Sequence, residues 1–302
     1  MPSRSKSRQG AAGQRAAQAR RDRAAHLRQE EARRDSRRRR FSALSTVAAA
    51  VAIVAALVIV RVVLGHNAKS GTPTSSAPAA VLQQVASVPA SVFAAVGTGD
   101  AQVGPKPVSG QPVSDTAGKP TVLYVGAEYC PYCAAERWPM VIALSRFGSF
   151  TGLGATHSSP SDAYPNTPTF SFHGATYSSP YLSLDAKELQ SNQVSGGSYK
   201  TLDKLNSAEN ADFKAGGSGY PYVNLAGRYR VTTQYDPHVL RGLTMEQIAA
   251  ALADPTSPVA KSVDGAANLI TAALCSVTHN QPANVCATAP ITSLESRLGG
   301  GA

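Results

Sequence analysis

The residues most able to do chemistry in this chain are two cysteines, Cys130 and Cys133, with Pro131 and Tyr132 between them. Thiols at this spacing can exchange a disulfide, because one thiolate attacks a substrate disulfide and the second thiol resolves the mixed disulfide. If the pair begins a helix, unpaired backbone N–H groups and the helix dipole stabilise a thiolate and lower its pKa. We therefore expect Cys130 to be the attacking nucleophile and Cys133 the resolving thiol.

The flanking residues place this pair between a strand and a helix. Residues 121–125 form a short apolar run with β-branched and aromatic side chains, bounded by Pro120 and Gly126, which predicts a buried strand. Residues 134–147 carry apolar side chains at helical spacing. Glu136, Arg137 and Trp138 are expected to pack or pair locally on this helix.

The remaining segments predict an alternation of helices and strands. They are a helix over 80–96 broken by Pro89, a loop over 97–119, a second strand at 152–159, extended structure over 167–177, a helix over 201–215, a hairpin of 220–225 and 229–235, and a helix that begins at Thr244 with Gln247 at its third position. The order is strand, Cys-x-x-Cys helix, strand, helix, strand, strand, helix.

Two alternatives to redox chemistry are open for the Cys130 and Cys133 pair. One is an inert structural disulfide, and the other is half of a zinc site. Zinc would require two further ligands at a recognisable spacing, and no second Cys-x-x-Cys or His-x-x-x-His motif occurs. His157 and His173 could complete a ligand set only if the fold happened to bring them close.

A second pair, Cys275 and Cys286, lies near the C-terminus with ten residues between its members. The intervening segment contains Asn280, Pro282 and Asn284, which is typical of a loop that a disulfide can close. We expect a structural disulfide that contributes about 2–4 kcal/mol by restricting the unfolded chain. The alternative is that this pair passes electrons to Cys130 and Cys133, which would require the two pairs to meet.

The net charge of +10 is concentrated in the first 40 residues, which hold 14 basic and four acidic residues. The remainder is therefore neutral and has no electrostatic surface for a phosphate backbone, so nucleic acid is not an expected partner. One functional hypothesis assigns the main role to this tail, which would bind anionic lipid or an acidic cytoplasmic partner.

An apolar stretch follows the tail and predicts a membrane anchor. Residues 43–60 carry no charge and approach the roughly 20 residues that a helix needs to cross hydrocarbon. A cleaved signal peptide is the alternative, but the long basic leader and the long apolar run favour an uncleaved helix over 41–64. Dense arginine before this helix, and only His66 and Lys69 soon after it, place the N-terminus in the cytoplasm and the larger part outside.

These observations divide the chain into five parts. They are a disordered basic tail (1–40), a transmembrane helix in the lipid bilayer (41–64), a flexible linker (65–79), an α/β domain (80–256), and a helical C-terminal extension with the second cysteine pair (257–302). Four cysteines, an even number, suit an oxidising extracytoplasmic compartment where disulfides persist.

The order of elements, with Cys130-Pro131-Tyr132-Cys133 at the start of the first helix, resembles the thioredoxin fold and its redox motif. The string Gly126-Ala-Glu-Tyr-Cys-Pro-Tyr-Cys-Ala-Ala-Glu-Arg-Trp138, with Gly-Tyr-Pro-Tyr-Val at 219–223 and the C-terminal cysteines, resembles a family of membrane-anchored, thioredoxin-like proteins of unknown function. The resemblance covers residues from about 80 to the end. It implies a thioredoxin-like domain with an insertion and a helical C-terminal extension.

Thioredoxin-like proteins place a cis-proline loop against the cysteine pair, where a substrate chain adds as a strand. The resemblance leaves two candidates. Thr167-Pro168-Thr169 looks more like the usual tripeptide, but Tyr220-Pro221 is followed by the strand, turn, strand and capped helix that the topology requires, and we favour Tyr220 and Pro221 as substrate-binding residues.

The chain also departs from well-studied thioredoxins, which carry Trp before the first cysteine and a buried acid in the preceding strand. Tyr129 and Tyr124 stand at those places. Glu128 is near the pair, but an acidic neighbour raises a thiol pKa.

Together these features predict a membrane-anchored, extracytoplasmic thiol-disulfide oxidoreductase. It would act through Cys130 on exported protein thiols or disulfides, without a cofactor. The alternative is a non-catalytic binding or scaffold domain whose disulfides are structural.

Overall fold

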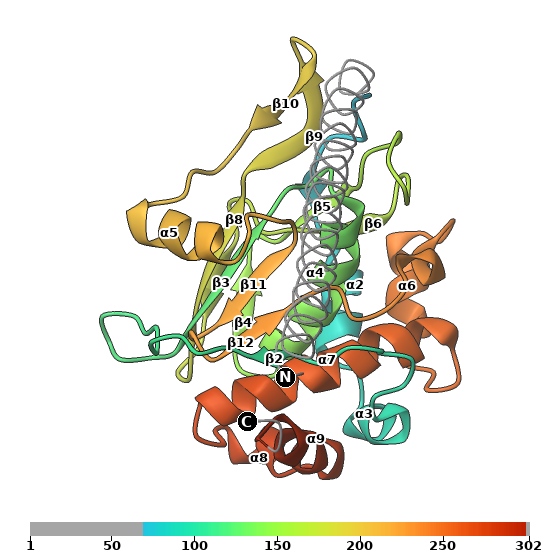
Figure 1. Ribbon diagram of the computed structural model, residues 1–302. Coiled ribbons are helices and arrows are strands. Elements are labelled where there is room, and N and C mark those ends of the chain that lie inside the picture. Colours follow the sequence, from blue (N-terminus) through green and yellow to red (C-terminus); the bar gives the residue numbers. More distant parts are fainter. Residues whose placement is uncertain (1–68, 300–302) are drawn as a thin grey trace, which may run out of the picture. The chain divides into compact units, whose positions relative to one another are not determined.

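The computed structural model describes residues 69–299, which belong to one compact unit of mixed α/β structure (Figure 1). The predicted tail (1–40) and transmembrane helix (41–64) lie outside the described residues. Between residues 69 and 299, no single helix has the length and apolar character needed to cross a membrane, although the bent pair formed by Ala79–Ala86 and Ala90–Val96 passes that test when taken together.

A five-stranded sheet forms the centre of this unit. One of its inner strands, β3, coincides with the apolar run that predicted a buried strand, and all six of its residues are buried. β3 pairs in parallel with β8 and antiparallel with β11, and the sheet continues from β11 through β12 to β2. The strands are β2 (Lys106–Pro107), β12 (Tyr229–Val231), β11 (Tyr222–Leu225), β3 (Thr121–Gly126) and β8 (Ser183–Glu188).

Helices cover both faces of the sheet because the side chains of β3 alternate between them. Val122 and Tyr124 belong to the main core, which also includes residues of α4 (Pro131–Ser145) and α7 (Pro258–Val277). Leu123 and Val125 belong to a smaller cluster with Phe213 of α5 (Ser207–Ala215). Figure 1 shows α5 on one side of the sheet, with α4 and α7 on the other.

Further helices pack beside this core. They are α2 (Ala79–Ala86), α3 (Ala90–Val96), the short 3-10 helix η2 (Pro237–Leu240), α6 (Met245–Ala251), α8 (Ala283–Cys286) and α9 (Ala289–Gly299). The break between α2 and α3 falls at the predicted Pro89, the N-cap residue of α3. α6 begins at the predicted capping box of Thr244 and Gln247.

The strand that follows α4 in the central sheet differs from the prediction. Residues 152–159 were expected to be the second strand of the order, and they do contain β5 (Gly154–His157). However, β5 lies between β1 (Ser75–Ser76) and β6 (Pro168–Ser171) in a separate three-stranded sheet. The parallel partner of β3 is β8, whose sequence Ser-Leu-Asp-Ala-Lys-Glu has no apolar run to mark it.

Two short strand pairs complete the described part. β4 (Ser149–Thr151) pairs with β7 (Thr176–Ser178), and β9 (Gln190–Ser195) pairs with β10 (Ser198–Thr201) in a hairpin that extends from the sheet (Figure 1). The predicted hairpin of β11 and β12 is present. Its turn residues Ala226 and Gly227 have φ values of 52° and 70°, and a side chain at Gly227 would collide with the backbone carbonyl of Gln111.

The segment expected to be a flexible linker (65–79) also differs from the prediction in the part that is described. Gly71 N–H donates to the Asn192 carbonyl at 2.9 Å, and the Thr74 hydroxyl donates to Glu128 at 2.9 Å. The next residues, Ser75–Ser76, form β1. Composition predicted flexibility, but the same small polar side chains are good hydrogen-bonding groups once partners are close.

Candidate functional site

The cysteine pair lies where the sequence predicted it, at the junction of β3 and α4. Cys130 is the N-cap residue of α4, and its Sγ accepts a hydrogen bond from the backbone N–H of Cys133 at 3.2 Å. Pro131 occupies the first helical turn, where its missing N–H costs no hydrogen bond. The Cys130 sulfur therefore faces the unpaired N–H groups at the start of the helix, which stabilise a thiolate.

The two sulfurs have unequal environments. Both cysteines are free thiols; Cys130 is 7% exposed, and Cys133 is fully buried. The hydrogen bond with the Cys133 thiol lowers the pKa of Cys130, although burial acts in the opposite direction. Burial raises the pKa of Cys133 well above its ordinary value. Cys130 is thus the thiol that ionises first and the one that a second molecule reaches first.

A small apolar cluster surrounds the pair. It consists of Ala127, Cys130 and Cys133, with Tyr129 and Tyr220 packed against it. Tyr220 precedes Pro221 at the end of the chain segment that leads into β11, and the peptide bond between them is cis. The loop favoured from the sequence therefore does meet the cysteine pair.

The competing proline has a different setting. Pro168 lies in β6, and its carbonyl accepts a hydrogen bond from the indole N–H of Trp138 at 2.9 Å. Trp138 is itself fully buried in the main core. This contact links α4 to the three-stranded sheet and identifies Pro168 as part of the support of the helix.

A buried ion pair lies directly behind the dithiol, and the sequence analysis missed it. Arg137 donates from Nε to Glu188 Oε1 at 2.7 Å and from Nη2 to Glu188 Oε2 at 2.6 Å. Both side chains are fully buried. Arg137 was expected to pair locally, but its partner is 51 residues away in the sequence. Pairing between a helix residue and a residue of a later strand leaves no local signal.

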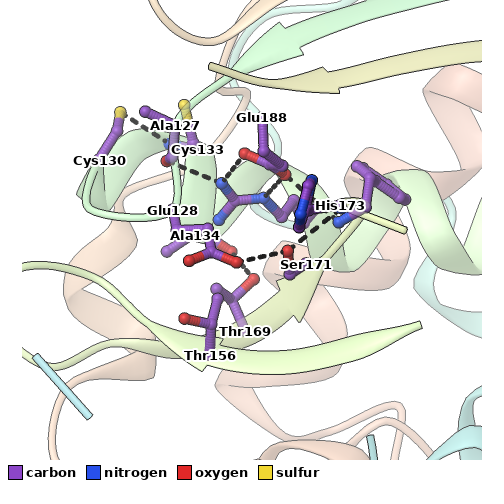
Figure 2. A network of polar contacts seen from close by, with 12 residues as sticks. Ala127, Glu128, Cys130, Cys133, Ala134, Thr156, Thr169, Ser171, His173 and Glu188 are labelled. Atoms are coloured by element: carbon purple, nitrogen blue, oxygen red, sulfur yellow. Dashed lines mark hydrogen bonds and ion pairs between the residues drawn. The ribbon is translucent and has the colours of Figure 1, made fainter. Parts of the chain in front are cut away.

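The same arginine contacts the backbone that carries Cys130. Arg137 Nη2 donates to the Ala127 carbonyl at 2.7 Å, and the backbone N–H of Cys130 donates to that carbonyl at 3.1 Å. The positive charge of Arg137 lowers the pKa of Cys130 and also opposes the effect of burial on Cys133. Figure 2 shows Cys130, Cys133, Ala127 and Glu188 together in this network.

The charge of Glu128 is engaged elsewhere. Its Oε1 accepts a hydrogen bond from the Ser171 hydroxyl at 2.6 Å (Figure 2). It also accepts one from the Thr74 hydroxyl at 2.9 Å. The sequence suggested that this acid could raise a thiol pKa. In the structure its side chain links Thr74, just before β1, and Ser171 of β6 to the loop that follows β3.

Aromatic side chains next to the pair are held by other aromatic rings. Tyr129 stacks on Tyr199 of β10, with ring centroids 4.1 Å apart. Tyr132, within the motif, is 43% exposed and meets the edge of Tyr164 at 5.6 Å. Tyr220 stacks at 5.8 Å on Phe213. These contacts place several aromatic rings around Cys130.

The second cysteine pair is a disulfide between Cys275 and Cys286, with Cα atoms 5.6 Å apart. It lies at the opposite end of the sheet from the dithiol. Ser276, beside Cys275, is hydrogen-bonded to Tyr229, whose strand partner Leu225 lies opposite Val122 near the start of β3. The structure therefore does not bring the two cysteine pairs together.

The two histidines considered as metal ligands have other settings. His173 Nδ1 lies 2.8 Å from Asp203 Oδ1, and His157 is half-buried in β5. Within residues 69–299, no group of three or more His, Cys, Asp or Glu side chains is placed to hold a metal ion.

Comparison with known proteins gives one match. The model of a domain of unknown function, DUF929, matches residues 107–196. This segment contains Cys130, Cys133, Arg137 and Glu188, but neither Tyr220 nor the C-terminal disulfide. No curated protein and no solved structure matches the chain.

Proposed function

We propose that this protein is a thiol-disulfide oxidoreductase that acts through Cys130 and Cys133 on exported proteins. The observation that carries the proposal is the pair of free thiols at the start of α4, where Cys130 caps the helix and accepts the N–H of Cys133. The two thiols differ in exposure and in pKa in the sense that a nucleophile and a resolving thiol require.

The arrangement of the sheet supports a thioredoxin-like domain as the framework. Two parallel strands, β3 and β8, flank a helix that starts with the cysteine motif, and an antiparallel hairpin, β11 and β12, extends the sheet on the other side of β3. Along the chain, β3, α4, β8, α5, β11, β12 and α6 occur in the predicted order of strand, Cys-x-x-Cys helix, strand, helix, strand, strand and helix, with β8 in place of the predicted second strand. The segment between α4 and β8 is then the insertion.

The proposed reaction is a two-electron exchange. The Cys130 thiolate attacks a substrate disulfide, forms a mixed disulfide and releases one substrate thiolate. Cys133 then loses its proton and attacks Cys130 Sγ, which closes the Cys130–Cys133 disulfide and releases the second substrate thiolate. The protein dithiol is oxidised and the substrate disulfide is reduced. The same steps in reverse oxidise a substrate dithiol.

We propose that an extended polypeptide binds the surface beside Cys130. Tyr220, which is joined to Pro221 by a cis peptide bond just before β11, packs against the dithiol, and Tyr132 presents an exposed ring. A substrate chain could add its backbone at Tyr220 and Pro221 while its apolar side chains contact the tyrosines. As part of this proposal, residues 41–64 anchor the protein in the membrane with this surface outside the cytoplasm.

The proposal is tested with the full-length protein and a disulfide-bonded peptide that becomes fluorescent on cleavage, with reduced glutathione as the electron donor. We expect turnover by the wild type, loss of turnover in Cys130→Ser and, when glutathione is left out, a trapped mixed disulfide in Cys133→Ser. The Cys275→Ala/Cys286→Ala variant is the matched control and should retain turnover. Equal cleavage by wild type and Cys130→Ser would refute the proposal.

The alternative function is a binding domain that holds a partner without exchange, and the exposed ring of Tyr132 among the aromatic rings around Cys130 favours it. The two functions differ in what happens to the partner. A binding domain would retain a partner peptide equally well after Cys130→Ser and Cys133→Ser substitution, and it would form no mixed disulfide.

A further inference from the structure

We propose that Arg137, held in place by Glu188, is the positioning residue that allows the buried Cys133 sulfur to act as the resolving thiolate. The inference rests on the proposed exchange function and adds to it a residue that supports the second step. Two observations support it. One is the buried ion pair of Arg137 and Glu188 behind the dithiol, and the other is the Ala127 carbonyl, which accepts hydrogen bonds from both Arg137 and the backbone N–H of Cys130.

The geometry fixes the guanidinium in one position. Arg137 follows Cys133 by one helical turn on α4, so both side chains lie on the same face of the helix. Glu188 is the strand partner of Gly126 at the end of β3. The two bonds to Glu188 and the bond to the Ala127 carbonyl hold the guanidinium plane next to the segment that carries Cys130.

The second chemical step needs such a charge. Cys133 is fully buried, and an unpaired thiolate in an apolar site is costly because burial disfavours the charged form. A thiolate is nevertheless required to attack Cys130 Sγ, so the Cys133 proton first passes to the substrate thiolate released in the first step or to water. A buried cation one helical turn away reduces the cost of that thiolate without entering the reaction.

Glu188 opposes the electrostatic effect of Arg137 on Cys133, but it also holds Arg137 in position. Its negative charge raises the pKa of Cys133, but less than the charge of Arg137 lowers it. It also supplies two hydrogen-bond acceptors, one for Nε and one for Nη2 of the buried arginine. Loss of the Glu188 charge and loss of the whole pair should therefore alter the resolving step in opposite directions.

The test follows reaction of the reduced full-length protein with dithiobis(nitrobenzoate), a disulfide that releases one coloured thiolate at each step. The first release reports attack by Cys130, and the second reports attack by Cys133 on the resulting mixed disulfide. In Arg137→Met/Glu188→Met we expect the second phase to slow by about tenfold for each unit by which the pKa of Cys133 rises, because the thiolate fraction falls by that factor. Its pH midpoint should move upward, while the amplitude of the first phase is retained.

Three comparisons separate an electrostatic role from a structural one. Arg137→Lys keeps the cation and should remain near the wild-type rate of the second phase, whereas Glu188→Gln keeps Arg137 without its counter-charge and should speed that phase. Arg137→Gln/Glu188→Gln removes the same charges with a different pair of side chains. A structural role would slow every variant in proportion to its loss of stability and would leave the pH midpoint unchanged.

The outcomes also separate this inference from the proposed function. If the wild type releases only one coloured thiolate, no Cys130–Cys133 disulfide forms and the proposed exchange itself is wrong. If the wild type releases two, but the variants lacking both charges match its second-phase rate and pH midpoint, then Arg137 has no part in the resolving step.

Discussion

The buried pair of Arg137 and Glu188 gives a sharp prediction about stability. Replacement of Arg137 by Met leaves a fully buried carboxyl without its cation. The two bonds to Glu188 that are lost, at 2.7 and 2.6 Å, are charge-assisted, and each such bond contributes about 1.5–3 kcal/mol. Relaxation and entry of water offset part of that loss. We therefore expect Arg137→Met to lower the free energy of unfolding by about 3–5 kcal/mol.

The stability lost in Arg137→Met should depend on pH, and the direction of this dependence follows from the pKa of Glu188. Burial raises the pKa of Glu188 in the folded protein, and Arg137 opposes that rise. Without Arg137 the folded-state pKa rises further above the unfolded value of about 4.3. Between these two values the unfolded chain loses the proton while the folded protein keeps it, so stability falls as pH rises. The difference between wild type and Arg137→Met should therefore be larger at pH 8 than at pH 5.

Urea unfolding of the full-length protein measures this difference. Trp138 is the single tryptophan and is fully buried on α4, so its fluorescence reports the core around the site. The matched control is Arg137→Met/Glu188→Met, in which no buried charge is left unpaired and the loss should be under about 1 kcal/mol. An Arg137→Met variant that loses less than about 1 kcal/mol at pH 8, or a double variant that loses as much as the single one, would refute the reasoning.

Three further predictions concern the remaining cysteines and one buried acid. Cys275→Ala/Cys286→Ala should lower the free energy of unfolding by about 2–4 kcal/mol, measured in urea without reductant; a midpoint equal to wild type would contradict it. The alkylation rate of Cys130 in the reduced protein should reach half its maximum below the free-thiol value of about pH 8.5, whereas Cys133 in Cys130→Ser should react only at higher pH. Equal profiles would show that their environments do not differ. Burial raises the pKa of Asp264 to about 8, so folding stability falls as pH rises from about 3.9 toward that value. Asp264→Asn should therefore be more stable than wild type at pH 9, and the difference in free energy of unfolding should be smaller at pH 5. A difference that does not change with pH would argue against this prediction.

Local signals in the sequence predicted the position of the dithiol. The apolar run of β3 ends at Gly126, and Pro131 occupies the first turn of α4, so the strand-to-helix junction could be read without tertiary information. The hairpin turn at Ala226 and Gly227 and the capping box at Thr244 are equally local. In each case a few adjacent residues determine the backbone.

The support of the site could not be predicted because it depends on residues far apart in the sequence. β8 is a polar strand, and what identifies it is pairing with β3 rather than its own composition. Glu188 at its end meets Arg137 only because α4 packs over that edge of the sheet. Likewise, Thr74 looked like part of a linker until Glu128 and β5 supplied its partners.

The central claim is that Cys130 and Cys133 form a disulfide that opens and closes in equilibrium with thiols. The most direct measurement is equilibration of the full-length protein over a series of glutathione to glutathione-disulfide ratios, followed by acid quenching, alkylation and mass spectrometry. We expect a two-electron transition in which both thiols are lost together, while Cys275 and Cys286 remain oxidised throughout. Thiols that stay fully alkylated across the series, or a Cys130 that takes up glutathione without closing on Cys133, would contradict it.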